Sequence, residues 1–168
     1  MMLLSEAATI LGVALTGADG EVLRVSTDSR NLQPGDLFIA LRGEKFDGGT
    51  YAPQALRQGA VGVVLDAHQA PDVSPAIRVE DTRLALGKLA AAWRNRFSLP
   101  IIAITGSNGK TTVKEMLAAI LRAEAGTEDA VLATAGNFNN DIGLPLMLLR
   151  LTASHRYAVL EMGMNHLG

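Results

Sequence analysis

One stretch of the sequence constrains the fold more than any other. The apolar run 101–104 leads directly into Thr-Gly-Ser-Asn-Gly-Lys-Thr-Thr, residues 105–112, and an amphipathic pattern follows from about Lys110 to Glu124. Strand, glycine loop and helix in this order are typical of one unit of a parallel α/β sheet, in which the loop lies at the carboxyl end of the strand. The sequence therefore predicts an α/β fold with a glycine loop at the edge of a parallel sheet.

This loop has the chemistry of a phosphate-binding loop, although Ile104 stands where the common pattern G-x-x-x-x-G-K-[ST] has its first glycine. Gly106 and Gly109 can take conformations that turn main-chain N–H groups toward an anion, and the following helix adds further N–H groups. Lys110 supplies a positive charge for the outer phosphates, and Thr111 a hydroxyl for Mg²⁺. The alternative is a plain βα turn with a solvated lysine, but Lys-Thr-Thr and the flanking elements favour phosphate binding.

A candidate metal ligand follows another buried strand. Glu161 comes after the run 157–160, at the carboxyl end of a predicted parallel strand, where ligands of doubly wound sheets bind. Mg²⁺ prefers oxygen ligands and usually takes one or two carboxylates, with phosphates and water completing its shell. A solvent-facing or helix-capping carboxylate is the alternative. The glycine loop one crossover away favours Mg²⁺ binding by Glu161 together with Thr111.

Between these two segments lies a polar stretch, residues 136–145, which reads GNFNNDIGLP. Asn137, Asn139 and Asn140 supply neutral donors and acceptors at the same predicted edge, and Asp141 is a candidate cap for a helix that begins near Ile142. Because asparagine is also common in turns, ligand binding and ordinary loop chemistry both remain open for this stretch.

The first half of the chain predicts a separate small α/β unit that closes near residue 81, by its hydrophobic patterns and turn residues. Strands are expected at 21–30, 37–41, 61–66 and 74–81, helices at 3–11 (N-cap Ser5, end at Gly12) and 51–60, and an exposed loop at 42–50. A connecting helix runs from residue 81 or 82 to about 97, and further strands follow at 130–134 and 157–163. The helix 110–124 has an apolar stripe of Val113, Met116, Leu117, Ile120 and Leu121.

Composition excludes several classes of function. The 168 residues suffice for one ordinary domain or two small ones. A net charge of −2 and 4% aromatic residues disfavour nucleic acid as a partner. The absence of cysteine excludes disulfides, thiolate metal sites and cysteine nucleophiles. With no signal-peptide pattern and no apolar run long enough to span a bilayer, we expect a cytoplasmic enzyme or binding protein without membrane insertion.

Three segments, TGSNGKTT, GNFNNDIGLP and LEMGMNHLG, occur in an order that resembles the ATP-binding domain of the Mur ligase family. Residues 26–64 resemble the UDP-binding domain of its MurE and MurF members, and the forms NFNNDIGLP and EMGMN are most similar to the MurF type. The resemblance covers nearly the whole chain in several separate blocks. It is therefore more specific than a single phosphate loop.

The resemblance implies an ATP- and Mg²⁺-dependent amide-bond ligase of peptidoglycan synthesis. In such ligases a carboxylate of UDP-N-acetylmuramoyl-tripeptide is phosphorylated, and the amine of D-alanyl-D-alanine then displaces phosphate from the acyl phosphate. Carried over by motif, Lys110 and Glu161 would be catalytic, and Thr111 and Glu161 would ligate Mg²⁺. The expected ATP-binding residues are Thr105, Gly106, Ser107, Asn108, Gly109, Lys110, Thr111, Thr112 and Asn137, and those for the UDP group are Ser29, Glu44, Lys45 and Phe46.

The resemblance also implies a domain organisation. Residues 1–82 would form the N-terminal domain for the UDP-muramyl peptide, and residues 83–168 the connecting helix and the first part of the central ATP-binding domain. Family members continue with a modified lysine, a histidine and a C-terminal domain. We therefore expect a monomeric N-terminal fragment of a MurF-type ligase that is inactive alone. The alternatives are a MurE-type ligase, which adds the third amino acid, and a non-catalytic UDP-sugar or nucleotide-binding module.

Overall fold

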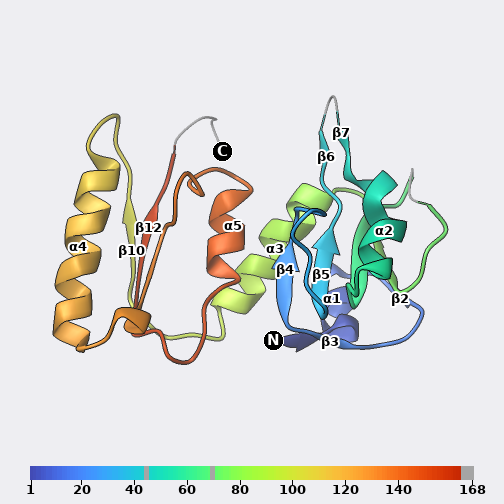
Figure 1. The fold of residues 1–168 in the computed structure, drawn as a ribbon, viewed down its shortest axis with the longest axis horizontal. Coiled ribbons are helices and arrows are strands. Elements are labelled where there is room, and N and C mark those ends of the chain that lie inside the picture. Colours follow the sequence, from blue (N-terminus) through green and yellow to red (C-terminus); the bar gives the residue numbers. More distant parts are fainter. Residues whose placement is uncertain (44–45, 69–70, 164–168) are drawn as a thin grey trace. The chain divides into compact units, whose positions relative to one another are not determined.

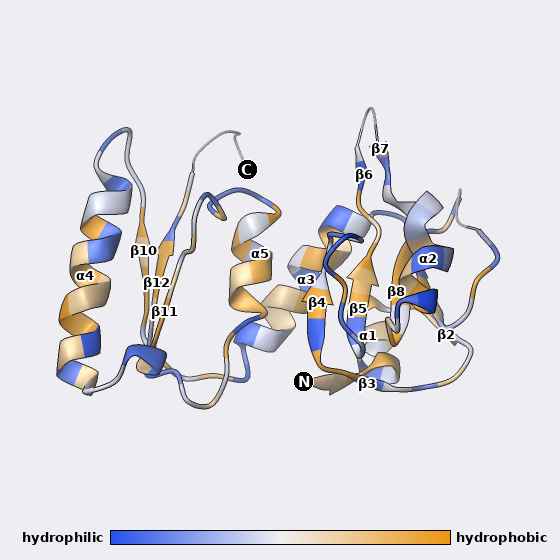
Figure 2. Cartoon of the chain, in the orientation of Figure 1, coloured by the Kyte–Doolittle hydropathy of each residue, from blue (hydrophilic) through white to orange (hydrophobic). Residues whose placement is uncertain are grey.

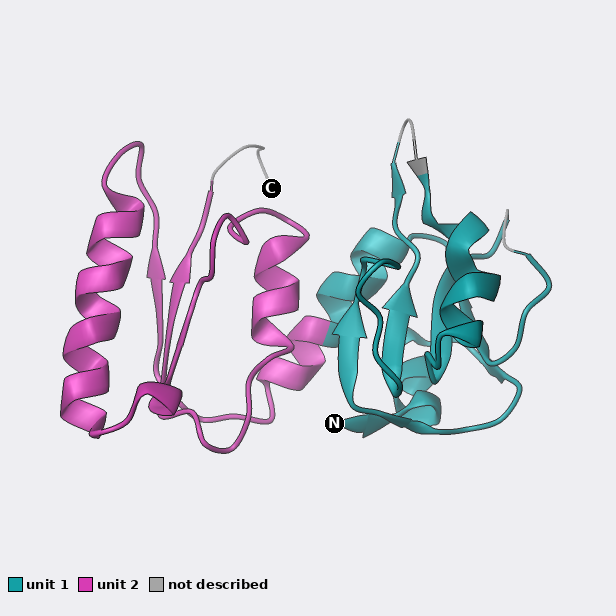
Figure 3. Ribbon diagram, viewed as in Figure 1, with its two compact units in different colours: residues 1–89 teal, residues 90–168 magenta. Residues whose placement is uncertain are grey.

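The computed structural model describes residues 1–43, 46–68 and 71–163, and the chain divides into two compact units (Figure 1 and Figure 3). Unit 1 is Met1–Leu89 and unit 2 is Ala90–Gly168, so the division falls inside the helix α3, Thr82–Arg94. Each unit contains parallel strands and helices, which confirms the α/β class expected from the sequence. Within the described ranges, none of the helices has the length and apolar character needed to cross a bilayer.

Unit 1 is built on a five-stranded sheet in the order β2-β9-β8-β5-β4, of which β2, β4 and β5 are labelled in Figure 1. The strands β4, β5, β8 and β9 are parallel, and β2 runs antiparallel to β9. All four residues of β5 are buried, as expected for a strand covered on both faces of a parallel sheet. The strands are β2 Leu15–Thr16, β4 Arg24–Ser26, β5 Asp36–Ile39, β8 Gly62–Asp66 and β9 Ala76–Val79.

Two short helices belong to this unit, α1 (Leu4–Leu11) and α2 (Ala52–Arg57). Alanines of α2 pack on apolar residues of β5 and β8, which Figure 2 shows in orange. Gly12 ends α1 in the left-handed conformation, as expected. The expected N-cap Ser5 is wrong, because Leu3 occupies the N-cap position and the Ser5 hydroxyl donates instead to Asp19 at 2.6 Å.

Two antiparallel ribbons complete unit 1. They pair β1 (Met2–Leu3) with β3 (Glu21–Val22), and β6 (Arg42–Gly43) with β7 (Phe46–Asp47), which is followed by the 3₁₀ turn η1 (Gly48–Tyr51). The segment 42–50 is therefore not simply the exposed loop expected from its charges and glycines. Gly48 is buried against the main chain, where a Cβ would lie 2.7 Å from the Leu41 carbonyl oxygen.

Unit 2 is built on a three-stranded parallel sheet in the order β10-β12-β11, and all three strands are labelled in Figure 2. The last of the described strands lies in the middle, between the two strands that precede it in the sequence. The elements are β10 Ile101–Ile104, α4 Lys110–Ala125, η2 Glu128–Ala130, β11 Val131–Ala133, α5 Gly143–Leu148 and β12 Tyr157–Glu161.

The two faces of this sheet carry separate apolar clusters. Ala158 and Leu160 of β12 pack with residues of α5, whereas Val159, between them, packs with Ala118 of α4. Because side chains alternate along a strand, Glu161 falls on the same face as Val159, toward α4. The pleat of β12 thus directs this carboxylate toward the helix that follows the glycine loop.

The buried face of α4 differs from the apolar stripe expected from its sequence. Val113, Met116 and Ile120 are 52%, 62% and 63% exposed, whereas Lys114 and Ala118 are buried. Leu117 and Leu121 are partly buried against the sheet, as the stripe predicts. The expectation is therefore wrong for three of its five members. The small side chain of Ala118 lets the helix approach Val159 closely, so the helix packs through Ala118 instead.

Candidate active site

The glycine loop joins β10 to α4 at the carboxyl edge of the sheet in unit 2. Gly106 has φ 145° and Gly109 has φ 76°, so both lie in the region that favours glycine. Gly109 is the N-cap of α4, and as a glycine it brings no side-chain oxygen to the first N–H groups of the helix. Residues 105–109 are exposed. This backbone offers main-chain donors and a helix N-terminus to a solvent-borne anion.

Lys110 is the first residue of α4, and its side chain folds back over the loop. Its Nζ donates a hydrogen bond of 2.6 Å to the carbonyl oxygen of Gly106. Its ammonium therefore lies beside the same main-chain segment that would surround a phosphate. The expected residues form one continuous segment, in which Thr105, Gly106, Ser107, Asn108 and Gly109 are the loop and Lys110, Thr111 and Thr112 are the first residues of α4.

Glu161 lies where α4 and β12 meet, and it is 4% exposed. Its two carboxylate oxygens accept separate hydrogen bonds, Oε2 from the Thr111 hydroxyl at 2.9 Å and Oε1 from the Asn139 amide at 2.8 Å. The bond from Asn139, and then that from Thr111, lowers the pKa of Glu161 below its usual value, and the charges of Lys114 and Lys110 act in the same direction. The side chain is therefore an ionised carboxylate at neutral pH.

The asparagine on this carboxylate is Asn139, which was left open at the sequence level between ligand binding and turn chemistry. Asn137, the asparagine expected at the nucleotide, is exposed, and its main-chain carbonyl accepts from the N–H of Asn139 at 2.8 Å. The spacing of the motif does not distinguish the two. Asn140 accepts from the N–H groups of Ile142 and Gly143, and the N-cap residue of α5 is Ile142, not the expected Asp141.

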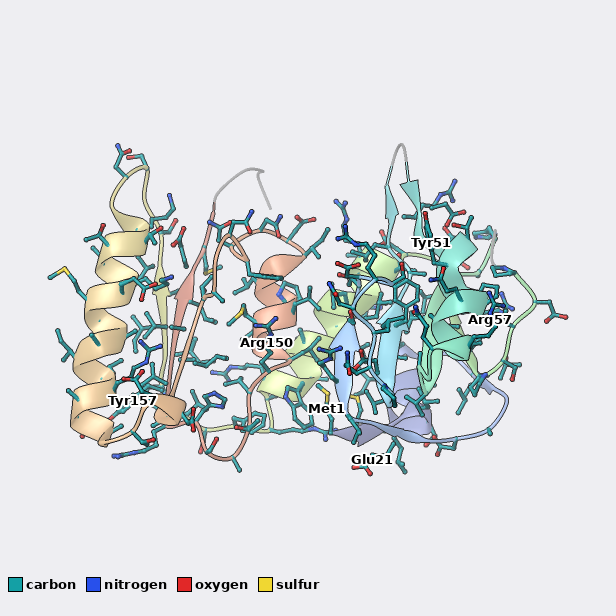
Figure 4. All side chains as sticks on the ribbon, in the orientation of Figure 1. Met1, Glu21, Tyr51, Arg57, Arg150 and Tyr157 are labelled. Atoms are coloured by element: carbon teal, nitrogen blue, oxygen red, sulfur yellow. The ribbon has the colours of Figure 1, made fainter. Side chains whose placement is uncertain are left out.

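The loop that carries Asn139 is anchored on both sides. The ring of Phe138 packs into the cluster under α5, and the guanidinium of Arg150 (labelled in Figure 4) lies 5.3 Å from the centre of that ring. Gly143 approaches the same residue closely, since a Cβ there would lie 2.4 Å from the Cα of Phe138. The position of Asn139 is thus fixed by packing as well as by hydrogen bonds.

Two further residues at this edge were missed at the sequence level. Thr134, just after β11, accepts a hydrogen bond of 2.8 Å from the main-chain N–H of Glu161, and Lys114 donates to the Thr134 carbonyl oxygen at 2.7 Å. Both side chains are buried. A lysine within a helix normally predicts a solvent-exposed position, so only the i, i+4 spacing from Lys110 could have indicated this one.

The oxygen atoms at this edge suit Mg²⁺, which binds through few protein ligands. Thr111 and Glu161 offer a hydroxyl and an ionised carboxylate that are already in contact. Among the residues that the structure describes, no cluster of three or more acidic or histidine side chains could hold a metal by itself. This donor set therefore fits a metal whose remaining ligands are phosphate and water.

In unit 1, a pocket of about 560 Å³ is lined by Thr27, Asp28, Ser29, Arg30, Phe38 and Tyr51, the last of which is labelled in Figure 4. Asp28 and Arg30 form a salt bridge of 2.8 Å, which lowers the pKa of Asp28 to about 2. Asp28 also accepts from the N–H of Arg30, so it both pairs with this residue and holds the turn. The expected Glu44 and Lys45 lie outside the described residues, and the main chain of Phe46 is part of β7.

Comparison with known proteins identifies the family. The model for the Mur ligase family catalytic domain matches residues 21–94, and that for the Mur ligase middle domain matches residues 104–168. The UDP-N-acetylmuramoyl-tripeptide–D-alanyl-D-alanine ligases of Haemophilus influenzae and Escherichia coli are each 49% identical, over 95% and 98% of this chain. The chain spans 35% of the length of each of these relatives.

Solved structures agree with the sequence comparison. The alignment with MurF from Acinetobacter baumannii covers 98% of this chain and 36% of the MurF chain, with a TM-score of 0.84 and 38% identity. The alignment with MurF ligase from Thermotoga maritima, solved in complex with ADP, covers 83% of this chain and 31% of the ligase chain, with a TM-score of 0.71 and 34% identity. The chain therefore belongs to the Mur ligase family and is a homologue of its MurF members.

Proposed function

We propose that this chain carries the UDP-substrate site and part of the ATP site of a ligase that adds D-alanyl-D-alanine to UDP-N-acetylmuramoyl-tripeptide. The 49% identity to two ligases named for this reaction supports the substrates. The observation that carries the chemistry is the 2.9 Å contact between Thr111 and Glu161, beside a glycine loop and Lys110. We assign residues 1–82 to the UDP-linked substrate and residues 83–168 to ATP, in a monomeric cytoplasmic protein.

The residues of unit 2 act mainly by positioning and charge neutralisation, as in other phosphoryl transfers. The N–H groups of residues 106–110 surround the phosphates of ATP, and Lys110 moves from the Gly106 carbonyl onto the β- and γ-phosphates. Thr111 and Glu161 would hold Mg²⁺, with Asn139 keeping the carboxylate in orientation and Asn137 near the nucleotide. Bound Mg²⁺ would neutralise charge that develops on the transferred phosphoryl group.

In the reaction, a carboxylate oxygen of the tripeptide attacks the γ-phosphorus of ATP, and ADP leaves. The amine of D-alanyl-D-alanine then attacks the acyl carbon, phosphate leaves, and the amine loses a proton. Both steps need a second substrate held close to the first. Since the chain spans 35% of its relatives, we expect it to bind ligands without completing the reaction by itself.

For the UDP group we propose Ser29 with Glu44, Lys45 and Phe46. Ser29 lines the pocket beside Phe38 and Tyr51, two aromatic rings of a size that suits a nucleobase. The salt bridge between Asp28 and Arg30 stabilises the turn that carries Ser29. The relatives named above favour this substrate over that of a MurE-type ligase. A competition assay between the two amino-acid substrates on the corresponding full-length ligase distinguishes them.

Calorimetry tests the proposal on the chain itself. Titration with ATP and Mg²⁺ and, separately, with UDP-N-acetylmuramoyl-tripeptide should show one site for each ligand. Ser29→Ala should weaken only the UDP-linked ligand. Binding of the UDP-linked ligand without any ATP binding would support a non-catalytic substrate module instead, and binding of neither would refute the proposed function.

A further inference from the structure

The most unusual side chain of unit 2 outside the proposed ligand set is Lys114. It lies in the second turn of α4 and is 2% exposed, while its neighbour Val113 is 52% exposed. A helix that buries its lysine and exposes its valine reverses the usual amphipathic arrangement. Because an isolated buried ammonium is strongly unfavourable, its partners indicate what it does.

Lys114 has two partners, one buried and one exposed. Its Nζ donates to the carbonyl oxygen of Thr134 at 2.7 Å, and it lies 2.7 Å from Oε1 of Glu115. The Glu115 side chain is 60% exposed, and the hydrogen bond from Lys114, together with its charge, lowers the pKa of that carboxyl group. The exposed pair could form without burying the lysine, so the contact with Thr134 is the one that requires its buried position.

Thr134 connects Lys114 to the proposed metal ligand. Its N–H donates to the Val159 carbonyl oxygen at 3.0 Å, and its hydroxyl accepts from the N–H of Glu161 at 2.8 Å. Because Lys114 donates to its carbonyl oxygen, both the N–H and the C=O group of Thr134 are hydrogen-bonded. Its side-chain hydroxyl makes a third hydrogen bond, with Glu161. The loop that begins here delivers Asn139 to the carboxylate of Glu161 at 2.8 Å, and the Asn139 carbonyl accepts from the N–H of Gly163 at 2.7 Å.

We propose that Lys114 is a positioning residue, whose buried ammonium holds the loop after β11 so that Asn139 and Glu161 are arranged for Mg²⁺–ATP. This inference rests on the proposed nucleotide site. Lys114 acts through Thr134 and need not touch the nucleotide. Lys110, one turn earlier, serves the phosphates directly, so two lysines at i and i+4 have different tasks.

A positioning role and a simple charge effect predict opposite changes in Mg²⁺-dependent binding when the Lys114 ammonium is removed. As a positive charge near the site, Lys114 repels Mg²⁺, so its loss would strengthen metal-dependent binding if charge alone mattered. As a positioning group, its loss would misplace Asn139 and Glu161 and weaken that binding. Substitution of groups behind metal ligands typically costs about 10–100-fold in metal affinity.

The test is Lys114→Met, which keeps the length of the side chain and removes its charge. Calorimetry of the whole chain with ATP, with and without Mg²⁺, should show at least about a tenfold loss of the Mg²⁺-dependent gain in affinity, with metal-free ATP affinity changed by no more than about twofold. Glu115→Gln is the matched control, because it removes the exposed ion pair and leaves Thr134 in place. It should bind Mg²⁺–ATP as the unsubstituted chain does.

A ligand-free readout separates this inference from the proposed function. The side-chain amide signal of Asn139 in a ¹⁵N-labelled sample should shift in Lys114→Met and not in Glu115→Gln. An unshifted signal, or unchanged or stronger Mg²⁺-dependent binding, overturns the positioning role. If Lys114→Met does not fold, Lys114→Gln carries the same comparison. Absence of ATP binding by the unsubstituted chain would refute the nucleotide site, while the Asn139 signal would still report whether Lys114 holds the loop.

Discussion

Glu161→Gln should remove the Mg²⁺-dependent part of ATP binding and leave unit 2 folded. Glu161 accepts from Asn139 at 2.8 Å and from Thr111 at 2.9 Å. A glutamine amide has nearly the same shape, so its oxygen can accept from Asn139 while its NH₂ group donates to the hydroxyl oxygen of Thr111. The two contacts become neutral hydrogen bonds, each weaker by about 1 kcal/mol. The expected loss of unfolding free energy is therefore about 1–2 kcal/mol.

The effect on the metal should be much larger than the effect on stability. Removing a group behind a metal ligand already costs about 10–100-fold, so replacing the anionic ligand should cost at least about 100-fold in Mg²⁺-dependent affinity. Urea unfolding measures the first quantity, and calorimetry with ATP in the presence and absence of Mg²⁺ measures the second. Glu124→Gln, near the C-terminal end of the same helix, is the charge-matched control and should leave nucleotide binding unchanged.

Two results would refute this reasoning. If Glu161→Gln binds Mg²⁺–ATP as tightly as the unsubstituted chain, the carboxylate is not a metal ligand. If the substitution instead unfolds unit 2, the carboxylate is needed mainly for structure, and its place beside the glycine loop no longer supports a catalytic role. The proposed site requires both a small change in stability and a large change in metal dependence.

Other predictions test the loop, its packing and the turn of unit 1. Lys110→Ala should weaken Mg²⁺–ATP binding at least about tenfold by calorimetry. Its unfolding free energy should stay within about 0.5 kcal/mol, because the hydrogen bond of Lys110 to the Gly106 carbonyl oxygen is exposed. Gly143→Ala should destabilise the chain by about 1–3 kcal/mol in urea unfolding, because the new methyl group would meet the main chain of Phe138 at 2.4 Å. In Gly87→Ala, within α3, the new Cβ would meet no heavy atom within 4 Å beyond its chain neighbours and the nearby helix backbone, so the substitution should instead stabilise the chain by about 0.4–1 kcal/mol. The folded-state pKa of Asp28, about 2, lies below its unfolded value, so its contribution to stability is present above the unfolded pKa and is lost as pH falls toward 2. In Asp28→Asn, the unfolding free energy should therefore fall less steeply with decreasing pH in this acid range than it does in the unsubstituted chain.

The elements of unit 2 could be predicted from sequence because their signals are local. The apolar run of β10, the glycines after it and the helical pattern from Lys110 each indicate one kind of element, and all three agree. The approach of Glu161 to Thr111 could also be anticipated, since parallel strands bring their carboxyl ends to one edge. The small ribbon of β6 and β7 could not, because each strand has only two residues, too few for an alternating pattern.

Residue-level contacts were harder to predict than elements. The motif contains three asparagines within four positions, and only the turn of the loop selects Asn139 for the carboxylate. Hydrophobic periodicity also treats every lysine as solvent-exposed, so it cannot find a buried one such as Lys114. In both cases the missing information is a three-dimensional contact between segments that lie far apart in the sequence.

The orientation of α4 explains why its hydrophobic pattern was misleading. Once the Thr111 hydroxyl meets Glu161 at the strand end, the residues three and seven positions later must face the sheet, because a helix repeats every 3.6 residues. These residues are Lys114 and Ala118, both of which are buried. Val113, Met116 and Ile120 are then turned away from this face, although they are more apolar. Local rules tend to be broken where a functional contact sets the geometry. The buried lysine and the exposed apolar residues of α4 therefore have one common cause, which is the contact between the glycine-loop helix and the carboxylate of β12.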